Sequence, residues 1–422
     1  MTRHVRLRRN PLQRMLSGRL LAGLAASALL AGLAAGTAQA QGHESHRQGN
    51  VGSLISDLYG GDGISLAAGS ANPAFSHVAH FTQDSADRLA DLNRVLSANI
   101  GAYSFNSAVS GVTFDFAEGQ AVRSSLSLGP IIGERAPTIG KGRVNVSTSY
   151  THIDYSQLDG RDLTDLTIDL SHQDIPTIDQ PFEHDEIELH LRLKLKQDIL
   201  TFATTYGVTE RLDVGVLIPI IDIRGSVSSE AHIIDNGGAG IHQFDPAGES
   251  PFDSNSASAT GVGDILVRAK WRAFDRVGGT PFDAALVGQI ALPTGDKNDL
   301  LGTGSTSAYI GGAFSGEFGK ITPHLNVGYE YFADEDRTAG IERSNVRMLL
   351  GADINATKNF SIASDIIARW EKDDDKFYDL ALGAKWAPTD TMDFSFNTIM
   401  PLNRNQGLRA DVIFSLGFET AF

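Results

Sequence analysis

The stretch Asp411–Phe422, DVIFSLGFETAF, decides the fold, because its side chains change character at every second residue. A period of two separates the two faces of a β-strand, whereas a helix would mix them. The odd-numbered positions are mostly polar, acidic or small, and the even-numbered positions are apolar apart from one threonine. The even-numbered face consists of Val412, Phe414, Leu416, Phe418, Thr420 and Phe422.

The same alternation continues from Gly142 to the end of the chain, in segments long enough to cross a lipid bilayer. Strands of water-soluble proteins usually have about five or six residues, whereas ~10 residues tilted at ~45° cross the hydrocarbon core. The apolar rows would face lipid and the polar rows a lumen. We therefore predict an all-β fold, an antiparallel transmembrane outer-membrane β-barrel of about 12 strands with a short irregular or helical, plug-like N-terminal segment.

The connections between these segments alternate in length, which is a second indication of such a barrel. Tight turns are expected at Thr209-Glu210 and Thr357-Lys358, and the longest loop at Arg224–Gly261. Outer-membrane barrels have short periplasmic turns and longer external loops. About 14 strands is the alternative, since residues 162–172 and 227–234 are also strand-like. The expected barrel strands begin near Gly142, Asp185, Leu212, Val262, Phe282, Ser307, Ile321, Asn345, Phe360, Phe377, Met392 and Leu408.

The start of the chain has the features of an export signal. Met1–Arg19 is rich in arginine and has no acidic residue, and Leu20–Gly36 is a run of Leu, Ala and Gly broken by Ser27. Ala38-Gln39-Ala40 then supplies the small residues of a cleavage site. We predict a signal peptide over residues 1–40, cleaved on the way to the bacterial outer membrane. A retained transmembrane anchor is the alternative.

Composition excludes several classes of protein. The 422 residues include no cysteine, so disulfides and thiolate metal sites are ruled out. The 35 Lys and Arg residues against 51 Asp and Glu residues give a net charge of −16, which argues against a nucleic-acid partner. Beyond residue 40 no apolar run reaches about 18 residues, so a bundle of membrane helices is excluded as well.

Residues 41–141 differ from the barrel region, predicted as residues 142–422. Apolar positions at helical spacing predict a short amphipathic helix between Gln83 and Ile100. We expect Leu54–Pro137 to fold partly into the barrel mouth as a plug, with Glu134 and Arg135 anchoring it to charges in the lumen. A flexible periplasmic extension is the alternative.

The polar rows of the strands supply the candidate functional residues. Rows of charge in a lumen would orient small solutes, and the cations would attract carboxylates. The alternative is cross-strand ion pairing that fills a narrow lumen. The lumen-lining candidates are Glu186, Glu188, His190, Arg192, Lys194, Arg268, Lys270, Arg272, Arg347, Asp353, Asp365, Arg369, Asp379 and Lys385.

Catalytic and metal signals are weak. No serine stands in a Gly-x-Ser-x-Gly motif, and the histidines are scattered along the chain. His43 with His46 would lie at a new N-terminus, and Asp373–Asp375 lacks the ligand spacing of a calcium loop. We therefore expect no enzyme activity, no catalytic residue, no metal and no cofactor.

Several motifs resemble the phenol-degradation meta-pathway outer-membrane family, over roughly residues 125 to 422. They are Leu128–Arg135, Thr138–Arg143, Thr205–Gly215, Gly261–Ile265 and Leu292–Asp296 with Leu301–Gly304. Members are labelled as transporters or barrel proteins and occur near catabolic genes for aromatic compounds. The chain is also similar, more distantly, to the fatty-acid and aromatic-hydrocarbon channels with an N-terminal hatch, where Asn72-Pro73-Ala74 matches a hatch motif.

Together these patterns predict a passive outer-membrane channel for small hydrophobic or aromatic molecules. Its partners would be membrane lipid, the transported solute and, during biogenesis, the barrel-assembly machinery. Phe418 and Phe422 resemble the C-terminal signal which that machinery recognises. The alternative function is a structural or adhesion barrel with a closed lumen.

Overall fold

The computed structural model describes residues 50–61, 63–68, 77–102, 114–115, 122–123, 133–172, 184–237, 240–244, 250–275, 281–333, 344–372 and 375–421. All of them belong to one compact unit, His46–Phe422. The segment expected to be a signal peptide, residues 1–40, lies outside the described residues, and its export role stays a prediction.

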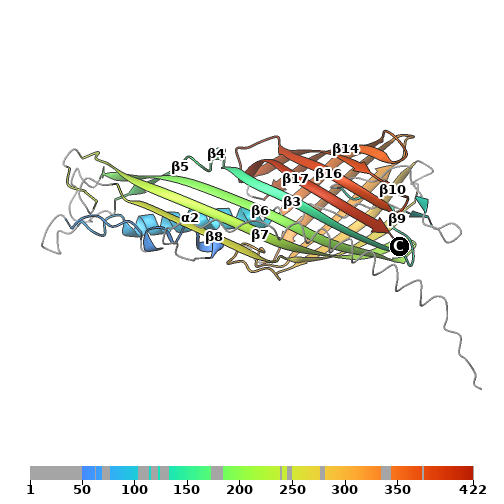
Figure 1. The fold of residues 1–422 in the computed structure, drawn as a ribbon, viewed down its shortest axis with the longest axis horizontal. Helices are drawn as coiled ribbons and strands as arrows, with labels where there is room; N and C mark the ends of the chain where they lie inside the picture. The colour runs from blue at the N-terminus through green and yellow to red at the C-terminus, as the bar shows by residue number, and fades with distance from the viewer. Residues whose placement is uncertain are drawn as a thin grey trace, which may run out of the picture. The chain divides into compact units, whose positions relative to one another are not determined.

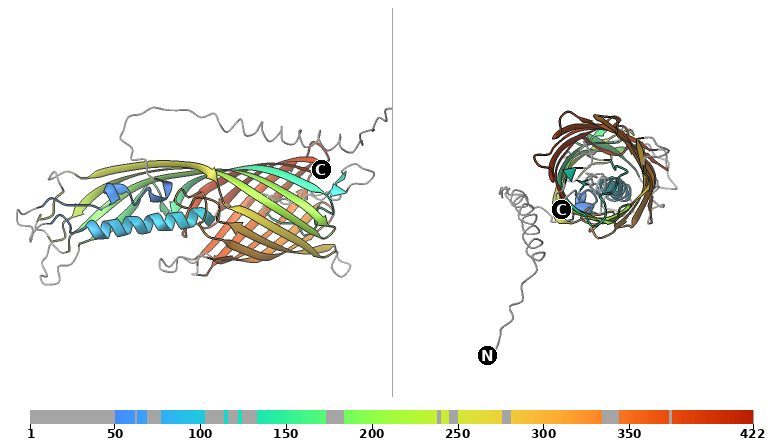
Figure 2. Two further views of the ribbon diagram at one scale, coloured as in Figure 1. Left: turned by 90° about the horizontal axis from the view of Figure 1, so that it is seen from below. Right: turned by 90° about the vertical axis from the view of Figure 1, so that its right-hand side faces the viewer.

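In the described part of the chain, 12 strands form a closed antiparallel barrel (Figure 1). The ring closes because β3 pairs with β17 on one side and with β6 on the other. The right-hand view of Figure 2 shows the ring end-on. The predicted barrel is confirmed. Its strands are β3 (Val144–Leu158), β6 (Glu186–Thr209), β7 (Leu212–Ile234), β9 (Ile265–Phe274), β10 (Phe282–Leu292), β11 (Ser307–Gly316), β12 (Ile321–Phe332), β13 (Asn345–Asn355), β14 (Phe360–Glu371), β15 (Lys376–Trp386), β16 (Met392–Pro401) and β17 (Leu408–Ala421).

Along most of the wall, the two faces of each strand separate as the alternation predicts. Ile310 is 67% exposed and Leu286 50% exposed on the outside of the barrel, while Asp353 and Asp365 are buried inside it. Exposed rows of large apolar side chains are stable only against lipid, and buried polar rows need partners within the lumen. The fold is that of a transmembrane outer-membrane β-barrel.

Two barrel strands extend well beyond the wall. The first half of β6 pairs with β5 (Leu166–Ser171), and the second half of β7 pairs with β8 (Phe252–Val262). We call this four-stranded part the sheet extension; it lies on the left in Figure 1. The expected external loop Arg224–Gly261 is therefore wrong, since it contains the end of β7 and most of β8. The strand-like residues 162–172 and 227–234 form part of the extension and add no barrel strand.

The amphipathic pattern of β6 reverses where the extension begins. In the extension, the inward positions from Ile187 to Leu195 are apolar and buried, and the outward positions between them are charged or histidine. In the wall, the inward positions are polar or small apart from Ile199; Gln197 and Thr201 are examples, and outward Tyr206 is exposed. The expectation that the apolar row of β6 faces lipid throughout is therefore wrong in the extension. Lipid covers only the wall, and beyond it the inner face has to bury the apolar residues.

The helix α2 (Thr82–Ala102) packs against the inner face of the extension, as the left-hand view of Figure 2 shows. Its buried side chains Leu89, Leu96 and Ile100 share one hydrophobic core with the leucines of β6. Asp84, in the first turn of the helix, accepts a hydrogen bond from the backbone N–H of Ser171, at the end of β5. Helix and extension thus bury each other's apolar faces.

Short elements complete the described fold. The 3-10 helices η1 (Val51–Ser53) and η2 (Leu58–Gly61) join the same core, and β4 (Arg161–Asp162) pairs with the end of β3. Two further two-residue strands, β1 (Phe114–Asp115) and β2 (Val122–Arg123), pair with each other. Among the described residues, no helix combines the length and the apolar character needed to cross a membrane.

Candidate functional site

One segment of the chain occupies the barrel interior at the end where the tight turns lie. We call it the inner segment, Gly133–Arg143; it immediately precedes β3. The carboxylate of Glu134 lies 2.5 Å from the guanidinium of Arg268 and 3.7 Å from the ammonium of Lys270, both on β9. The backbone N–H of Glu134 donates to the side-chain oxygen of Asn326, and the side-chain NH₂ group of Asn326 donates to the Glu134 carbonyl. This acid is thus held from two sides of the barrel.

Lys270 is the centre of these contacts. Its ammonium donates to the backbone carbonyls of Arg135, at 3.2 Å, and Pro137, at 2.8 Å, and lies 3.9 Å from Asp213. The side chain is 2% exposed. A buried ammonium is tolerated only where carboxylates and carbonyls replace its hydration shell. Lys270 therefore depends on the inner segment as much as the segment depends on Lys270.

The rest of the inner segment is attached to the barrel through backbone hydrogen bonds and one side-chain ion pair. Arg135 is buried and pairs with Glu317 at 3.1 Å. The backbone N–H of Ala136 donates to the Ser315 hydroxyl, and that of Ile139 donates to Asp213. These contacts come from β7, β11 and the turn after it, so the segment crosses the lumen rather than following one strand.

The last residues of β6, just before its turn into β7, bind the end of the inner segment. The Gly142 N–H donates to the Gly207 carbonyl at 2.7 Å, and the Gly207 N–H donates to the carbonyl of Arg143 at 3.0 Å. A Cβ atom on Gly207 would collide with the carbonyl oxygen of Gly140. A glycine is therefore required here by the close approach of two backbones.

A second group of buried charges lies on β12, β13 and β14. The Nε2 atom of His324 is 2.6 Å from Asp365, and its Nδ1 atom is 3.9 Å from Asp353. All three side chains are essentially inaccessible to solvent. A Cβ on Gly133 of the inner segment would come within 3.2 Å of the His324 ring, so the segment packs directly on this group.

A third group lies nearer the other end of the barrel. Arg409 pairs with Asp379 at 2.6 Å, and the guanidinium of Arg369 stands 4.0 Å from the centre of the Phe377 ring. Arg369 also pairs with Glu371 at 3.1 Å. Charged groups thus line the interior on β14, β15 and β17 as well. These contacts join the strands to one another and do not involve the inner segment.

The predicted lumen-lining residues divide into two sets. Those on β9, β13, β14 and β15 occupy the inward rows, and most have ion-pair partners on neighbouring strands or in the inner segment. This set comprises Arg268, Lys270, Arg272, Arg347, Asp353, Asp365, Arg369, Asp379 and Lys385.

For the candidates on β6, the prediction that they line the lumen is wrong. Glu186, Glu188, His190, Arg192 and Lys194 lie on the outer face of the sheet extension, opposite the buried leucines. His190 pairs there with Glu188 at 2.6 Å, on an exposed surface. The physical reason is the reversal described above. Because α2 packs on the inner face of the extension, the apolar residues of β6 lie on that face and the charged residues lie on the outer one. These five side chains do not line the lumen.

Sequence reasoning missed several residues that hold the inner segment. Asp213, Asn326 and Glu317 bind it directly. Asn326 stands on the inward row of β12 with Glu330, so the alternation itself could have nominated it. Glu317 follows the end of β11, where no pattern distinguishes a partner from a solvated turn residue.

Phe418 on β17 lies opposite Phe394 on the neighbouring strand β16, and their ring centres are 5.2 Å apart. Phe422 lies outside the described residues, as do His43, His46, Asp373 and Asp374. The role of Phe418 and Phe422 in barrel assembly therefore stays a prediction.

A closed antiparallel ring with an apolar outer surface and a chain segment bound inside it defines an outer-membrane β-barrel with an occupied lumen. The family model described as "Putative MetA-pathway of phenol degradation" matches residues 192–399. The resemblance inferred from the sequence motifs is confirmed by this match. A search of the curated proteins finds no significant match.

Solved structures of three bacterial outer-membrane proteins are similar to the chain at low identity. An outer-membrane channel from Pseudomonas putida F1 has 14% identity and a TM-score of 0.43, covering 68% of this chain and 98% of its own. The toluene transporter TbuX from Ralstonia pickettii has 10% identity and a TM-score of 0.37, covering 77% and 99%. A FadL homologue from Pseudomonas aeruginosa has 12% identity and a TM-score of 0.32, covering 68% and 91%.

Proposed function

We propose that this chain is a passive outer-membrane channel for small hydrophobic or aromatic molecules, closed at rest by the inner segment. One observation carries the proposal: the segment is bound to the lumen wall by side-chain contacts and is not itself a strand of the wall. Such a segment can leave its position without breaking the barrel, whereas a wall strand cannot.

The width of the barrel supports a gated rather than an open pore. Barrels of about eight strands are filled by their own side chains, and porins of about 16–18 strands leave a wide aqueous channel. A 12-strand ring lies between these cases. The ion pairs of the inward rows narrow it further, and the inner segment occupies the end that remains.

The solute class rests on the family comparison. The matched family is described by phenol degradation. The apolar side chains on the inner face of the extension, such as Leu193 and Ile223, are buried beneath α2, so they would meet a neutral aromatic molecule only after α2 had moved.

The orientation follows from the rule for this class of barrel. Short turns face the periplasm and long connections face outward, so we place the extension outside the cell and the inner segment at the periplasmic end. The predicted signal peptide would direct export of the chain. The barrel-assembly machinery would then insert the barrel into the outer membrane.

A flux experiment tests the function. The mature chain is reconstituted in liposomes, and the swelling rate is measured with phenol and with a sugar of similar or larger size. For the unchanged protein we expect selective entry of phenol. For Glu134→Gln, which lacks the carboxylate that binds Arg268, we expect a faster swelling rate with both solutes. Lys196→Gln is the matched control, because it removes an exposed ion pair with Asp154 on the outer surface.

The second candidate function is a structural or adhesion barrel with a permanently closed lumen. The charged outer face of the extension, with Arg192 and Lys194, favours this function because it offers a surface for partners. The same swelling experiment separates the two. A chain that passes no solute, even as the Glu134→Gln variant, has the closed lumen of the alternative.

A further inference from the structure

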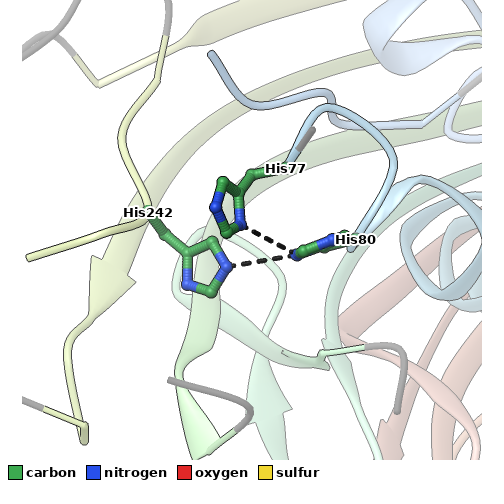
Figure 3. Close-up of side chains that lie close together, drawn as sticks. All are labelled: His77, His80 and His242. Carbon is green, nitrogen blue, oxygen red and sulfur yellow. Dashed lines mark hydrogen bonds between the residues drawn. The ribbon is translucent and has the colours of Figure 1, made fainter. Parts of the chain in front are cut away.

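Four histidines that are far apart in the sequence converge at one point of the fold. His77 and His80 precede α2, His172 follows β5, and His242 follows β7. Figure 3 shows His77, His80 and His242 pointing toward one another. The ligating nitrogens of these three residues lie within 4.8 Å of one another.

The nitrogens surround the Nδ1 atom of His80. It lies 3.3 Å from Nδ1 of His77, 3.3 Å from Nε2 of His242 and 2.7 Å from Nε2 of His172. An imidazole nitrogen carries either one proton or one lone pair, so it can make one good hydrogen bond. Hydrogen bonding therefore cannot account for three close imidazole neighbours around a single nitrogen. A cation among them would use all the lone pairs at once.

Part of the spacing agrees with a four-coordinate metal ion, and small ring movements would bring the remaining nitrogens, which lie within 4.8 Å of one another in His77, His80 and His242, to the same distance. Zinc–imidazole bonds are about 2.0–2.1 Å long, which places two nitrogens of a tetrahedral site about 3.3–3.4 Å apart. Two of the observed separations, both 3.3 Å, match this edge length. The 2.7 Å approach of His172 is shorter, so its ring would move back slightly to take the fourth position.

A buried carboxylate sets the state of one ligand. The Nδ1 atom of His242 lies 2.8 Å from Asp185, and Asp185 also accepts a hydrogen bond from the Gly237 N–H. Because a carboxylate only accepts, the proton of His242 must be on Nδ1, and its Nε2 lone pair faces His80. Histidine ligands of metals usually have such a carboxylate or carbonyl behind them.

Two of the four histidines are shielded from water. The side chains of His242 and its partner Asp185 are 0% and 1% exposed, and His172 is also buried. The buried ring of Phe81 stands edge-on to His172 and His242, with ring centres 5.4 and 5.7 Å away. His77 and His80 are partly exposed. Burial of a polar nitrogen requires a partner that replaces its lost hydration, and a metal ion is such a partner.

We infer that His77, His80, His172 and His242 form a binding site for a divalent transition-metal ion of the zinc type. Imidazole ligands suit zinc, copper and nickel, whereas magnesium and calcium prefer oxygen. Four protein ligands make a structural rather than a catalytic site. The ion joins the segment before α2 to the ends of β5 and β7, and so fastens α2 inside the extension. The proposal departs from the expectation of no metal, which was drawn from the sequence alone.

The test uses the mature chain in detergent, stripped with a chelator and then titrated with Zn²⁺ alone. The bound metal is counted by mass spectrometry after dialysis. We expect about one tightly bound zinc ion per chain, loss of that ion in His80→Gln and His242→Gln, and affinity about 10–100-fold weaker in Asp185→Asn. Mg²⁺ should not compete.

The control is the second histidine pair of the extension, His190 and His232, which lies on the outer face with rings 5.2 Å apart. The His190→Gln/His232→Gln variant should keep the zinc ion. Loss of the ion there, together with its retention in His80→Gln, would overturn the proposal.

Folding of each variant is checked by the heat-dependent gel mobility of the barrel. If the His80 and His242 variants do not fold, X-ray absorption of the wild-type zinc complex decides. A first shell of imidazole nitrogens supports the proposal, and a shell dominated by oxygen contradicts it, as does the absence of tightly bound zinc.

Discussion

Glu134 and Arg268 lie 2.5 Å apart inside the barrel, one on the inner segment and the other on β9. Their side chains are 16% and 3% exposed, so each neutralises a charge that solvent hardly reaches. The pair joins the inner segment to the barrel wall. It is therefore the contact at which the proposed closure of the lumen can be tested.

Removing either partner should loosen the inner segment. A buried charge that loses its partner costs about 3–5 kcal/mol, so Glu134→Gln and Arg268→Gln should each raise protease cleavage within Gly133–Arg143 strongly. The destabilisation of the double variant should be smaller than the sum of the two single effects, because neither member of the Glu134–Arg268 pair is left without the other. Cleavage is followed by mass spectrometry. The exposed pair Lys196–Asp154 should show coupling of about 0–1 kcal/mol, and additive effects at Glu134 and Arg268 would contradict the buried ion pair.

Gly207→Ala should weaken the attachment of the inner segment to the β6–β7 turn. The new Cβ would meet the Gly140 carbonyl, and overpacking of this kind costs about 1–3 kcal/mol. The temperature at which the barrel loses its folded gel mobility should fall. Gly288→Ala is the control, since nothing lies within 4 Å of a Cβ at that position. Equal behaviour of the two variants would show that the two backbones are not in contact.

The reversal of β6 predicts opposite sensitivities at neighbouring residues. Leu191 is 1% exposed in the core shared with α2, so Leu191→Ala should cost about 2–5 kcal/mol. Arg192 points to solvent, and Arg192→Ala should change stability by at most about 0.5 kcal/mol. Hydrogen exchange of α2 reports the difference. Rapid exchange in Arg192→Ala but not in Leu191→Ala would place the apolar row on the outside.

Tyr59 predicts a loss of stability in alkali. Its hydroxyl donates to Ser229 at 2.9 Å, and burial raises its pKa from 10.0 to about 12, with Asp253 and Glu230 adding to the effect. A raised pKa means that the folded state favours the neutral phenol. The contribution of Tyr59 to the stability of the folded state is therefore complete below pH 10 and is lost as the pH rises toward 12.

The pH dependence is measured as release of α2 from the extension, by hydrogen exchange or proteolysis at increasing pH. Tyr59→Phe keeps the ring and removes the titrating group, so the part of the loss due to Tyr59 should be absent. Identical pH profiles for the two proteins would assign the alkaline loss to other groups.

The period of two was sufficient to place the strands. The predicted starts at Leu212, Phe282 and Met392 coincide with the observed ones, because alternation records which side chains share a face of a strand. The same alternation cannot tell which face is inside. In β6 the apolar residues face inward where α2 covers the sheet. Nothing in the sequence of β6 indicates that α2 packs there.

For the charged residues inside the barrel, the sequence likewise predicts the positions but not the pairing. Arg268 and Lys270 could be nominated from their inward row, and Glu134 and Arg135 from their place before the first strand. Their pairing depends on the path of the inner segment across the lumen, which brings Glu134 to β9 and Arg135 to Glu317. Side chains from separate segments meet only through the closed sheet, so pattern alone could not assign these pairs.

The sequence by itself determined the barrel, because alternating side chains in long segments have a stable solution only as a closed sheet in lipid. The tertiary structure decided what lies within the ring and its extension. The inner segment, α2 and the four histidines are brought together by contacts between residues far apart in the chain. Such contacts depend on distance in space, and the local periodicity of a strand carries no information about it.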